Sequence, residues 1–253
     1  MKLHFLGTGG YHPTERRHTA CLMLPEIGVI FDAGTSFYRV EKLRQTDRVQ
    51  IFLSHAHLDH IVGLTYILVP LLRGGLNHAD VYGSAATIDA VRRHLFSPPM
   101  FPVLPDYRFH LLEEHAEIPV PGDGVVTHQP LPSHPGGSTA FRLDFPSAGD
   151  VPARSLAYVT DTTVDGTYTE FIRGADLLIH ECNFSDDEAE WCDRTGHSHT
   201  SQTAALARAA GVGRMILLHV DPQLDGDDPL DLAVARSVFP ETELAEDGDV
   251  REF

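Results

Sequence analysis

The chain has 253 residues, of which 42% are hydrophobic and 22% are charged, so it is long enough to bury a sizeable core. Its formal net charge of −17 makes long nucleic acid an unfavourable partner, because the basic residues include only two adjacent arginine pairs. No apolar run reaches the roughly 20 residues of a membrane span, and the N-terminal apolar run is too short for a signal peptide.

Short apolar or alternating segments, bounded by glycine, proline and polar turns, predict β-strands. We expect strands at 2–6, 19–24, 29–31, 49–53, 81–83, 125–131, 139–145, 155–160, 176–180 and 215–218. Helical spacing predicts helices at 61–72, 85–95, 168–173, 201–210 and 230–238. Ser84 is a suitable N-cap for the second of these helices. Three prolines make 97–102 a loop, and the segment 96–104 is either a lid over a site or a packed surface loop.

The order of these elements predicts the fold class. In each half of the chain strands come first and helices follow, which favours an α+β fold with two sheets packed face to face and helices outside, a four-layer αββα sandwich. No linker-like or low-complexity stretch divides the sequence. We therefore expect a single domain over 1–253, and the repeated pattern suggests two similar halves.

Cysteine usage is sparse. Cys21, Cys182 and Cys192 are an odd set that makes no disulfide framework, which fits a reducing cytoplasm. Metal binding by Cys182 and Cys192 is the less favoured interpretation, because no Cys-x-x-Cys spacing supports it.

The densest cluster of chemically active side chains is the run 55–60, His-Ala-His-Leu-Asp-His, in a chain with 16 histidines. Imidazole and carboxylate groups are natural ligands of zinc and related metals. Four such groups within six residues cannot all bind one tetrahedral ion without strain. We therefore expect two ions, one bound by His55 and His57 and the other by Asp59 and His60. A polar surface loop with chance histidines is the alternative, but the run follows a buried-type strand, where sites in α/β folds gather.

Single ligand-type residues follow three other predicted strands. His134 comes after 125–131, Asp161 after 155–160 and His219 after 215–218. Each alone would more often be a structural residue, but the repetition favours all three as ligands. Asp161 is the natural bridge, since a carboxylate offers two oxygens to two ions.

The run 55–60 resembles the HxHxDH signature of the metallo-β-lactamase fold, and the segments 6–10 and 31–34 also match that family in order. The resemblance implies two zinc ions, with manganese or iron as substitutes, and a ligand set spread over the chain. The first metal is expected on His55, His57 and His134, the second on Asp59, His60 and His219, with Asp161 bridging. The flavo-diiron branch has glutamate where this chain has His57.

Two further motifs resemble the ribonuclease Z-like branch of this fold. In that branch a glutamate after a strand pairs with a histidine of a Gly-His-Ser motif, here Glu181 and Gly196-His197-Ser198. His197 keeps the family distance to Gly211, and His199 is a second choice. With Asp59, Glu181 and His197 are the expected catalytic residues, since a cationic histidine can protonate a leaving oxygen. A purely structural Glu181–His197 pair is the alternative.

The resemblance implies hydrolysis of a phosphodiester by metal-activated hydroxide. Ribonuclease Z carries a long arm that grips tRNA between the third and fourth metal motifs, but here that interval, 135–160, has room for little beyond a hairpin and only two cations. A small phosphodiester or cyclic phosphate is therefore the expected substrate, and tRNA 3′ processing is disfavoured. The alternatives are a hydrolase of a thioester, lactone or β-lactam, and a non-catalytic binding protein. A homodimer is expected from the resemblance alone.

Overall fold

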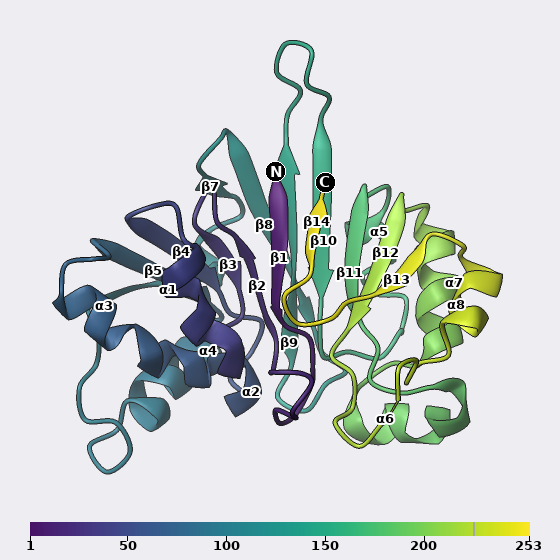
Figure 1. Cartoon of the computed structure of the whole chain (residues 1–253), viewed down its shortest axis with the longest axis horizontal. Helices are drawn as coiled ribbons and strands as arrows, with labels where there is room; N and C mark the ends of the chain where they lie inside the picture. Colours follow the sequence, from purple (N-terminus) through teal and green to yellow (C-terminus); the bar gives the residue numbers. More distant parts are fainter. Residues whose placement is uncertain (225) are drawn as a thin grey trace.

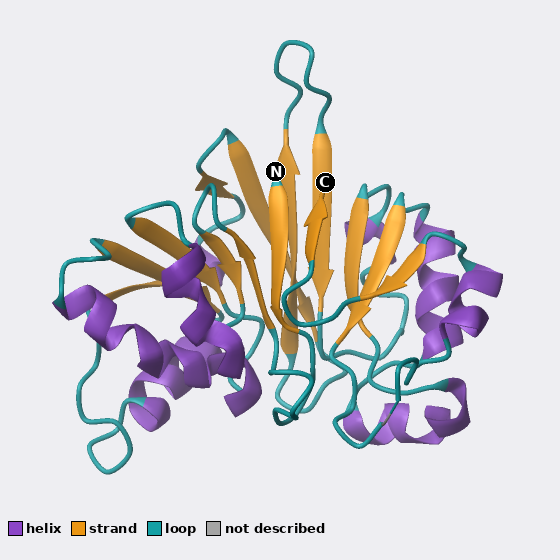
Figure 2. Ribbon diagram, in the orientation of Figure 1, coloured by secondary structure: helices purple, strands orange, loops and turns teal. Residues whose placement is uncertain are grey.

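Two sheets face each other and carry helices on their outer surfaces (Figure 1, Figure 2). The computed structural model describes residues 1–224 and 226–253. The four-layer αββα sandwich predicted from the sequence is confirmed. None of the helices in the described part of the chain combines the length and the hydrophobicity that a membrane crossing requires.

The first sheet has seven strands in the order β14-β1-β2-β3-β4-β5-β6, and β3 to β6 run parallel. Its strands are β1 (Lys2–Gly7), β2 (Cys21–Leu24), β3 (Val29–Phe31), β4 (Arg48–Phe52), β5 (His78–Gly83), β6 (Tyr107–Leu111) and β14 (Val250–Glu252). The pairing of β14 with β1 joins the two ends of the chain in one sheet.

The second sheet also has seven strands, in the order β13-β12-β11-β10-β9-β8-β7, and β10 to β13 run parallel. Its strands are β7 (Ile118–Val120), β8 (Gly124–Leu131), β9 (Ser138–Phe145), β10 (Arg154–Val159), β11 (Leu177–Glu181), β12 (Arg214–Leu218) and β13 (Thr242–Leu244). The interval 135–160 is an antiparallel hairpin of β9 and β10, as its length predicts, and its tip projects beyond the sheets (Figure 1).

Helical segments are short and lie outside the sheets (Figure 2). Beside the first sheet are η1 (Thr35–Arg39), α1 (Val40–Leu43), α2 (Leu58–Ile61), η2 (Val62–Ile67), α3 (Leu68–Leu72), α4 (Ala85–Ala90), η3 (Val91–Leu95) and η4 (Leu112–Glu114). Those that follow later in the chain are α5 (Thr169–Ile172), η5 (Asp186–Trp191), α6 (Cys192–Thr195), α7 (Thr200–Ala210) and α8 (Leu232–Val238).

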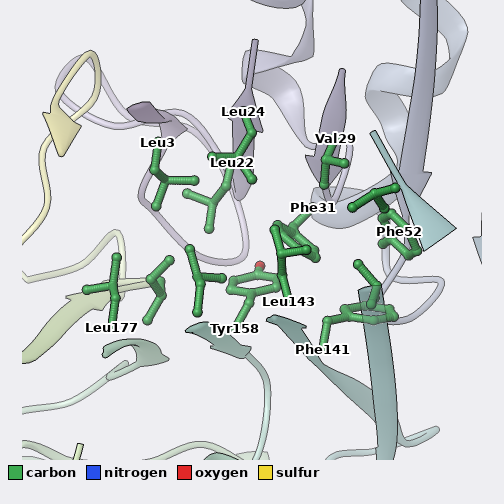
Figure 3. Packing of buried hydrophobic residues seen from close by; sticks show 14 of the residues in the cluster. Leu3, Leu22, Leu24, Val29, Phe31, Phe52, Phe141, Leu143, Tyr158 and Leu177 are labelled. Carbon is green, nitrogen blue, oxygen red and sulfur yellow. The ribbon is translucent and has the colours of Figure 1, made fainter. Parts of the chain in front are cut away.

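Three apolar layers hold the four structural layers together. The central one lies between the sheets, where Leu22 and Phe31 of the first sheet face Phe141 and Tyr158 of the second (Figure 3). The other two lie between each sheet and its helices. Successive side chains of a strand point to opposite faces, so Leu22 enters the central layer while its neighbours enter the outer one. Strands buried on both faces therefore read as continuous apolar runs.

Two predicted helices differ from the structure. The segment 61–72 is not one helix but α2, η2 and α3 in succession. Pro70 accounts for the break before α3, because it has no N–H to donate and its ring clashes with the carbonyl four residues earlier. The segment 85–95 is helical throughout but widens into a π-helix from Val91. Ser84 caps it as predicted, accepting a hydrogen bond of 3.2 Å from the Thr87 N–H.

Candidate metal centre

The run 55–60 and the loops after β8, β10 and β12 meet at one edge of the sandwich, near α2 at the lower edge of the sheets in Figure 1. Parallel strands place their carboxyl ends at a common edge, and β4, β10 and β12 each contribute a loop there. All seven residues that the sequence singles out as ligands come together in this way.

The first group of donor atoms belongs to His55, His57, His134 and Asp161, and these atoms all lie within 4.8 Å of one another. His57 Nδ1 lies 3.0 Å from His134 Nε2. Asp161 Oδ2 lies 3.7 Å from His55 Nε2 and 3.5 Å from His134 Nε2. His57 is exposed while the other three are buried, so this group is open to solvent on one side.

The second group belongs to Asp59, His60 and His219, again within 4.8 Å of one another. His60 Nε2 and His219 Nε2 are 3.2 Å apart, and Asp59 Oδ2 lies 3.3 Å and 3.6 Å from them. Asp161 Oδ1 completes the group at 3.2 Å from His60 Nε2 and 3.3 Å from His219 Nε2. Asp161 thus directs one oxygen into each group, which is the arrangement of a bridging carboxylate.

The protonation states of Asp161 and His134 suit metal binding. Burial raises the pKa of Asp161, but His219, His60 and His55 outweigh it and hold the pKa well below its usual range. Burial lowers the pKa of His134 to about 4 against the opposing effect of Asp161, which leaves a neutral ring with a free lone pair. Metal binding requires ionised carboxylates and neutral imidazoles.

An unpaired buried atom also fits a metal. His55 Nε2 is buried and has no hydrogen-bond partner, although it faces the first group. An unpartnered buried polar atom costs about 1–3 kcal/mol, and a metal ion that accepts its lone pair would remove that cost. Despite burial, Asp161, Asp59 and Asp32 raise the pKa of His60 well above its usual value. The three carboxylates therefore stabilise a positive charge at this position. The donor set therefore fits divalent metal.

Glu181 and His197 form a pair beside the first and second groups of donor atoms, which together are called the metal groups below. Glu181 ends β11 and is fully buried, and its Oε1 lies 3.2 Å from His197 Nδ1. Burial lowers the pKa of His197, but the Glu181 carboxylate more than compensates and raises it to about 9. The ring lies close to the second group, with a donor atom within 4.8 Å of those of Asp161 and His219.

His199, the second-choice histidine, lies elsewhere. Its Nδ1 is 2.8 Å from Asp186 Oδ1, and the same oxygen accepts the Ser201 N–H at the start of α7. Of the two histidines in the motif, the structure therefore places His197 at the metal groups and His199 at a helix terminus.

Residues 28–220 match the family model described as "Beta-lactamase superfamily domain". The chain belongs to the β-lactamase superfamily. Curated relatives of this superfamily member include ribonuclease Z of Methanosarcina acetivorans, 27% identical over 98% of this chain and 96% of the relative, and ribonuclease Z of Acaryochloris marina, 29% identical over the same shares. The first alignment spans 296 positions, more than the 253 residues of this chain, so that relative has segments with no counterpart here.

Solved structures agree on the metallo-β-lactamase fold. YhfI from Bacillus subtilis superposes with a TM-score of 0.78 at 22% identity, covering 99% of both chains. The short form of human tRNase Z reaches 0.74 at 24% identity, covering 100% of this chain and 99% of its own. A diphosphatase of the PhnP family also reaches 0.74, at 20% identity over 100% and 96%. With this fold and this His/Asp cluster, the chain is a metal-dependent hydrolase of the superfamily.

Asp32 contacts His60 of the second group from behind. The sequence does not single out this residue. It is completely buried, and its Oδ2 lies 2.8 Å from His60 Nδ1. Ser54 and Tyr158 donate hydrogen bonds to the same carboxylate. Such a carboxylate fixes the ring of a ligating histidine and increases its basicity. The signal in the sequence was the acidic residue directly after β3, inside the matched segment 31–34.

Backbone strain also gathers at this edge. Asp32, Asp161 and His219 have φ values of 57°, 51° and 62°, in the left-handed region that non-glycine residues rarely adopt. Such strain persists only where surrounding contacts determine the conformation, and it clusters at functional sites. Here it turns each side chain toward the centre directly after its strand.

Asp32→Asn should weaken metal binding about 10- to 100-fold. A neutral amide holds the Nδ1 side of the His60 ring less strongly than a carboxylate, which makes the metal-facing Nε2 less basic. Zinc affinity measured by competition with a chelator tests this. Asp80→Asn is the matched control, since Asp80 makes a similar carboxylate–histidine contact, 2.8 Å from His110 Nε2, away from the metal groups. Equal losses of affinity in both variants would contradict the role of Asp32.

Two weaker expectations find no support at the centre. Cys182 and Cys192 are buried free thiols, and neither joins a potential metal cluster within the described residues. Phe96 and Phe101 pack together and against the outer apolar layer of the first sheet, with ring centroids 5.6 Å apart. The segment 96–104 does not line the cavity at the metal groups, which favours the surface loop over the lid.

Proposed function

We propose that this protein is a dinuclear zinc phosphodiesterase that hydrolyses a small phosphodiester or cyclic phosphate. The observation that carries the proposal is the Glu181–His197 pair beside a carboxylate that faces two groups of donor atoms. The donor groups suit two divalent ions, and a cationic histidine next to them suits an anionic leaving oxygen.

The two ions would supply a hydroxide nucleophile at neutral pH and neutralise the charge on the phosphoryl oxygens. His55, His57 and His134 would hold one ion, His60, His219 and Asp59 the other, and Asp161 both. Manganese or iron could replace zinc at such nitrogen and oxygen donors.

Asp59 is held in place by the backbone. Its Oδ2 accepts the Tyr11 N–H at 3.0 Å, which fixes the carboxylate at the rim of the second group. From this position it orients the attacking water as well as binding metal. The cavity at the metal groups is lined by Asp59, Asp161 and His197 together, so all three can reach one substrate.

His197 is the proposed proton donor to the leaving oxygen. Glu181 Oε1 holds its Nδ1 and also accepts the Thr162 N–H at 2.9 Å, so the carboxylate is itself oriented. The Glu181 carboxylate raises the pKa of the ring, which favours its protonated form. The free Nε2 can then donate to a leaving group in the cavity.

Similarity to known proteins favours phosphorus over carbon as the attacked atom. The curated relatives are named ribonuclease Z, and one structural neighbour is titled a diphosphatase. A large RNA is disfavoured by the net charge of −17 and by the plain hairpin at 135–160, which leaves no arm to grip it. We therefore propose a small substrate.

The proposal treats 1–253 as one hydrolase domain, supported by the central apolar layer to which both sheets contribute. Three free cysteines are in keeping with the proposed cytoplasmic location.

The test is a substrate panel on zinc- and manganese-loaded enzyme. Aryl phosphodiesters and cyclic phosphates should be hydrolysed, whereas thioesters and lactones should not, because the His197–Glu181 pair serves an anionic phosphoryl group. Turnover of thioesters or lactones without turnover of any phosphodiester would instead assign the protein to the carbonyl-hydrolysing branch of the fold.

A further inference from the structure

A second cavity, the side cavity, adjoins the metal centre. It measures about 360 Å³, in the lower part of the range for small-molecule sites, roughly 300–1,000 Å³. Its walls come from the loop after β4, the start of α4, η4, the end of β8 and the loop between β8 and β9.

The side cavity borders the cavity at the metal centre. His57 and Pro135 line both cavities, and His55 lines the side cavity as well. A substituent on a phosphate at the donor groups would therefore meet the side cavity beside His57. His197 lines only the cavity at the metal centre.

Apolar side chains form a large part of the lining of the side cavity. Ala56, Ala86, Leu112, Leu131 and Pro132 are among its walls, alongside serine, threonine and histidine side chains. Within the described residues, neither cavity is lined by a lysine or arginine. Phosphate groups of nucleic acids are bound chiefly by such cations. The side cavity is therefore unsuited to a second phosphate.

The charged side chain in the side cavity, apart from histidines, is Glu113. Its two oxygens accept the Ala85 N–H at 2.9 Å and 3.1 Å, which fixes the carboxylate at the α4 wall. A carboxylate repels an anionic group and accepts hydrogen bonds from a neutral or cationic donor.

We infer that the side cavity binds the uncharged, largely apolar ester group that remains on phosphorus, with any amino or hydroxyl donor directed toward Glu113. This inference rests on the proposed phosphodiesterase function and names the substrate class: a phosphodiester with a single phosphate and one uncharged organic group. The leaving group lies on the other side, next to His197, which does not reach the side cavity.

The test uses three p-nitrophenyl phosphodiesters whose second group is methyl, phenyl or 4-carboxyphenyl, with zinc-loaded full-length enzyme. The phenyl ester should exceed both others in kcat/KM by about tenfold, since a pocket rewards a filling apolar group and penalises an unpaired charge. Ala86→Phe should remove the advantage of phenyl over methyl. Glu113→Gln should reduce the discrimination against carboxyphenyl.

Asp89→Phe is the control, because Asp89 is exposed on the same helix and does not line the side cavity. Ala86 is also exposed, so the larger ring displaces no core residue. Equal efficiency for methyl and phenyl esters in the wild type, or equal changes for both in Ala86→Phe, would overturn the inference and leave the proposed function intact. Failure of the zinc-loaded wild type to hydrolyse any of the three esters would overturn the proposed function.

Discussion

Asp161→Asn should reduce phosphodiester hydrolysis by about a thousandfold or more, since a bridging carboxylate affects both metal groups and metals contribute several kcal/mol of transition-state stabilisation. The amide removes a negative charge that lies 3.2–3.7 Å from four histidine nitrogens. We expect fewer bound metals as well as slower turnover.

Elemental analysis together with steady-state kinetics measures both effects. The wild type should contain close to two transition-metal ions per chain. Asp176→Asn is the control: Asp176 accepts hydrogen bonds from Ser155 at the other end of the β10–β11 pair and does not lie at the metal groups. An Asp161→Asn variant with two bound metal ions and full activity would refute the bridging role. A wild-type protein that does not bind zinc would refute the dinuclear centre.

His197→Ala should lower turnover by about 10²- to 10⁴-fold, the usual contribution of a positioned general acid. Metal content should remain unchanged, because Asp161 and His219 retain their other partners at the second group. Loss of metal in this variant would instead identify His197 as a metal ligand. This outcome is worth testing because a nitrogen of His197 lies within 4.8 Å of donor atoms of Asp161 and His219.

His199→Ala is the matched control, because His199 contacts Asp186 and should leave turnover close to wild type. Glu181→Gln adds a readout that a structural pair would not show. Since Glu181 raises the pKa of His197, its neutralisation lowers that pKa, and the alkaline fall of kcat/KM should move to lower pH. An unmoved profile would mean that His197 does not supply the proton.

The fold was largely predictable where the pattern of apolar residues or a helix-ending glycine lies within one short stretch of the chain. Strands buried on both faces, such as β2 and β12, are largely apolar runs, and α7 ends just before Gly211, whose φ of 63° suits a helix terminus. The short edge strands β6, β7, β13 and β14 were not predicted. Three of them have only three residues, and their pairing partners decide whether they form at all.

The helical region 35–43 and the segment 186–195 were missed for a related reason. Both consist of short 3-10 and α turns, which carry too few residues for a periodic pattern. The segment 61–72 was predicted as one helix because its apolar spacing outweighed the single local signal, Pro70.

By itself, the sequence determined which residues to consider and how many metals to expect, because four ligand-type side chains within 55–60 are a local property of the chain. The tertiary structure alone decided that Asp32 lies behind His60, whereas the sequence had already favoured Asp161 as the bridge and His197 over His199. Those relations join residues from separate strands, and only the packing of two sheets around a common core brings them within contact distance. The side cavity beside His57 arises in the same way, from walls contributed by segments far apart in the sequence.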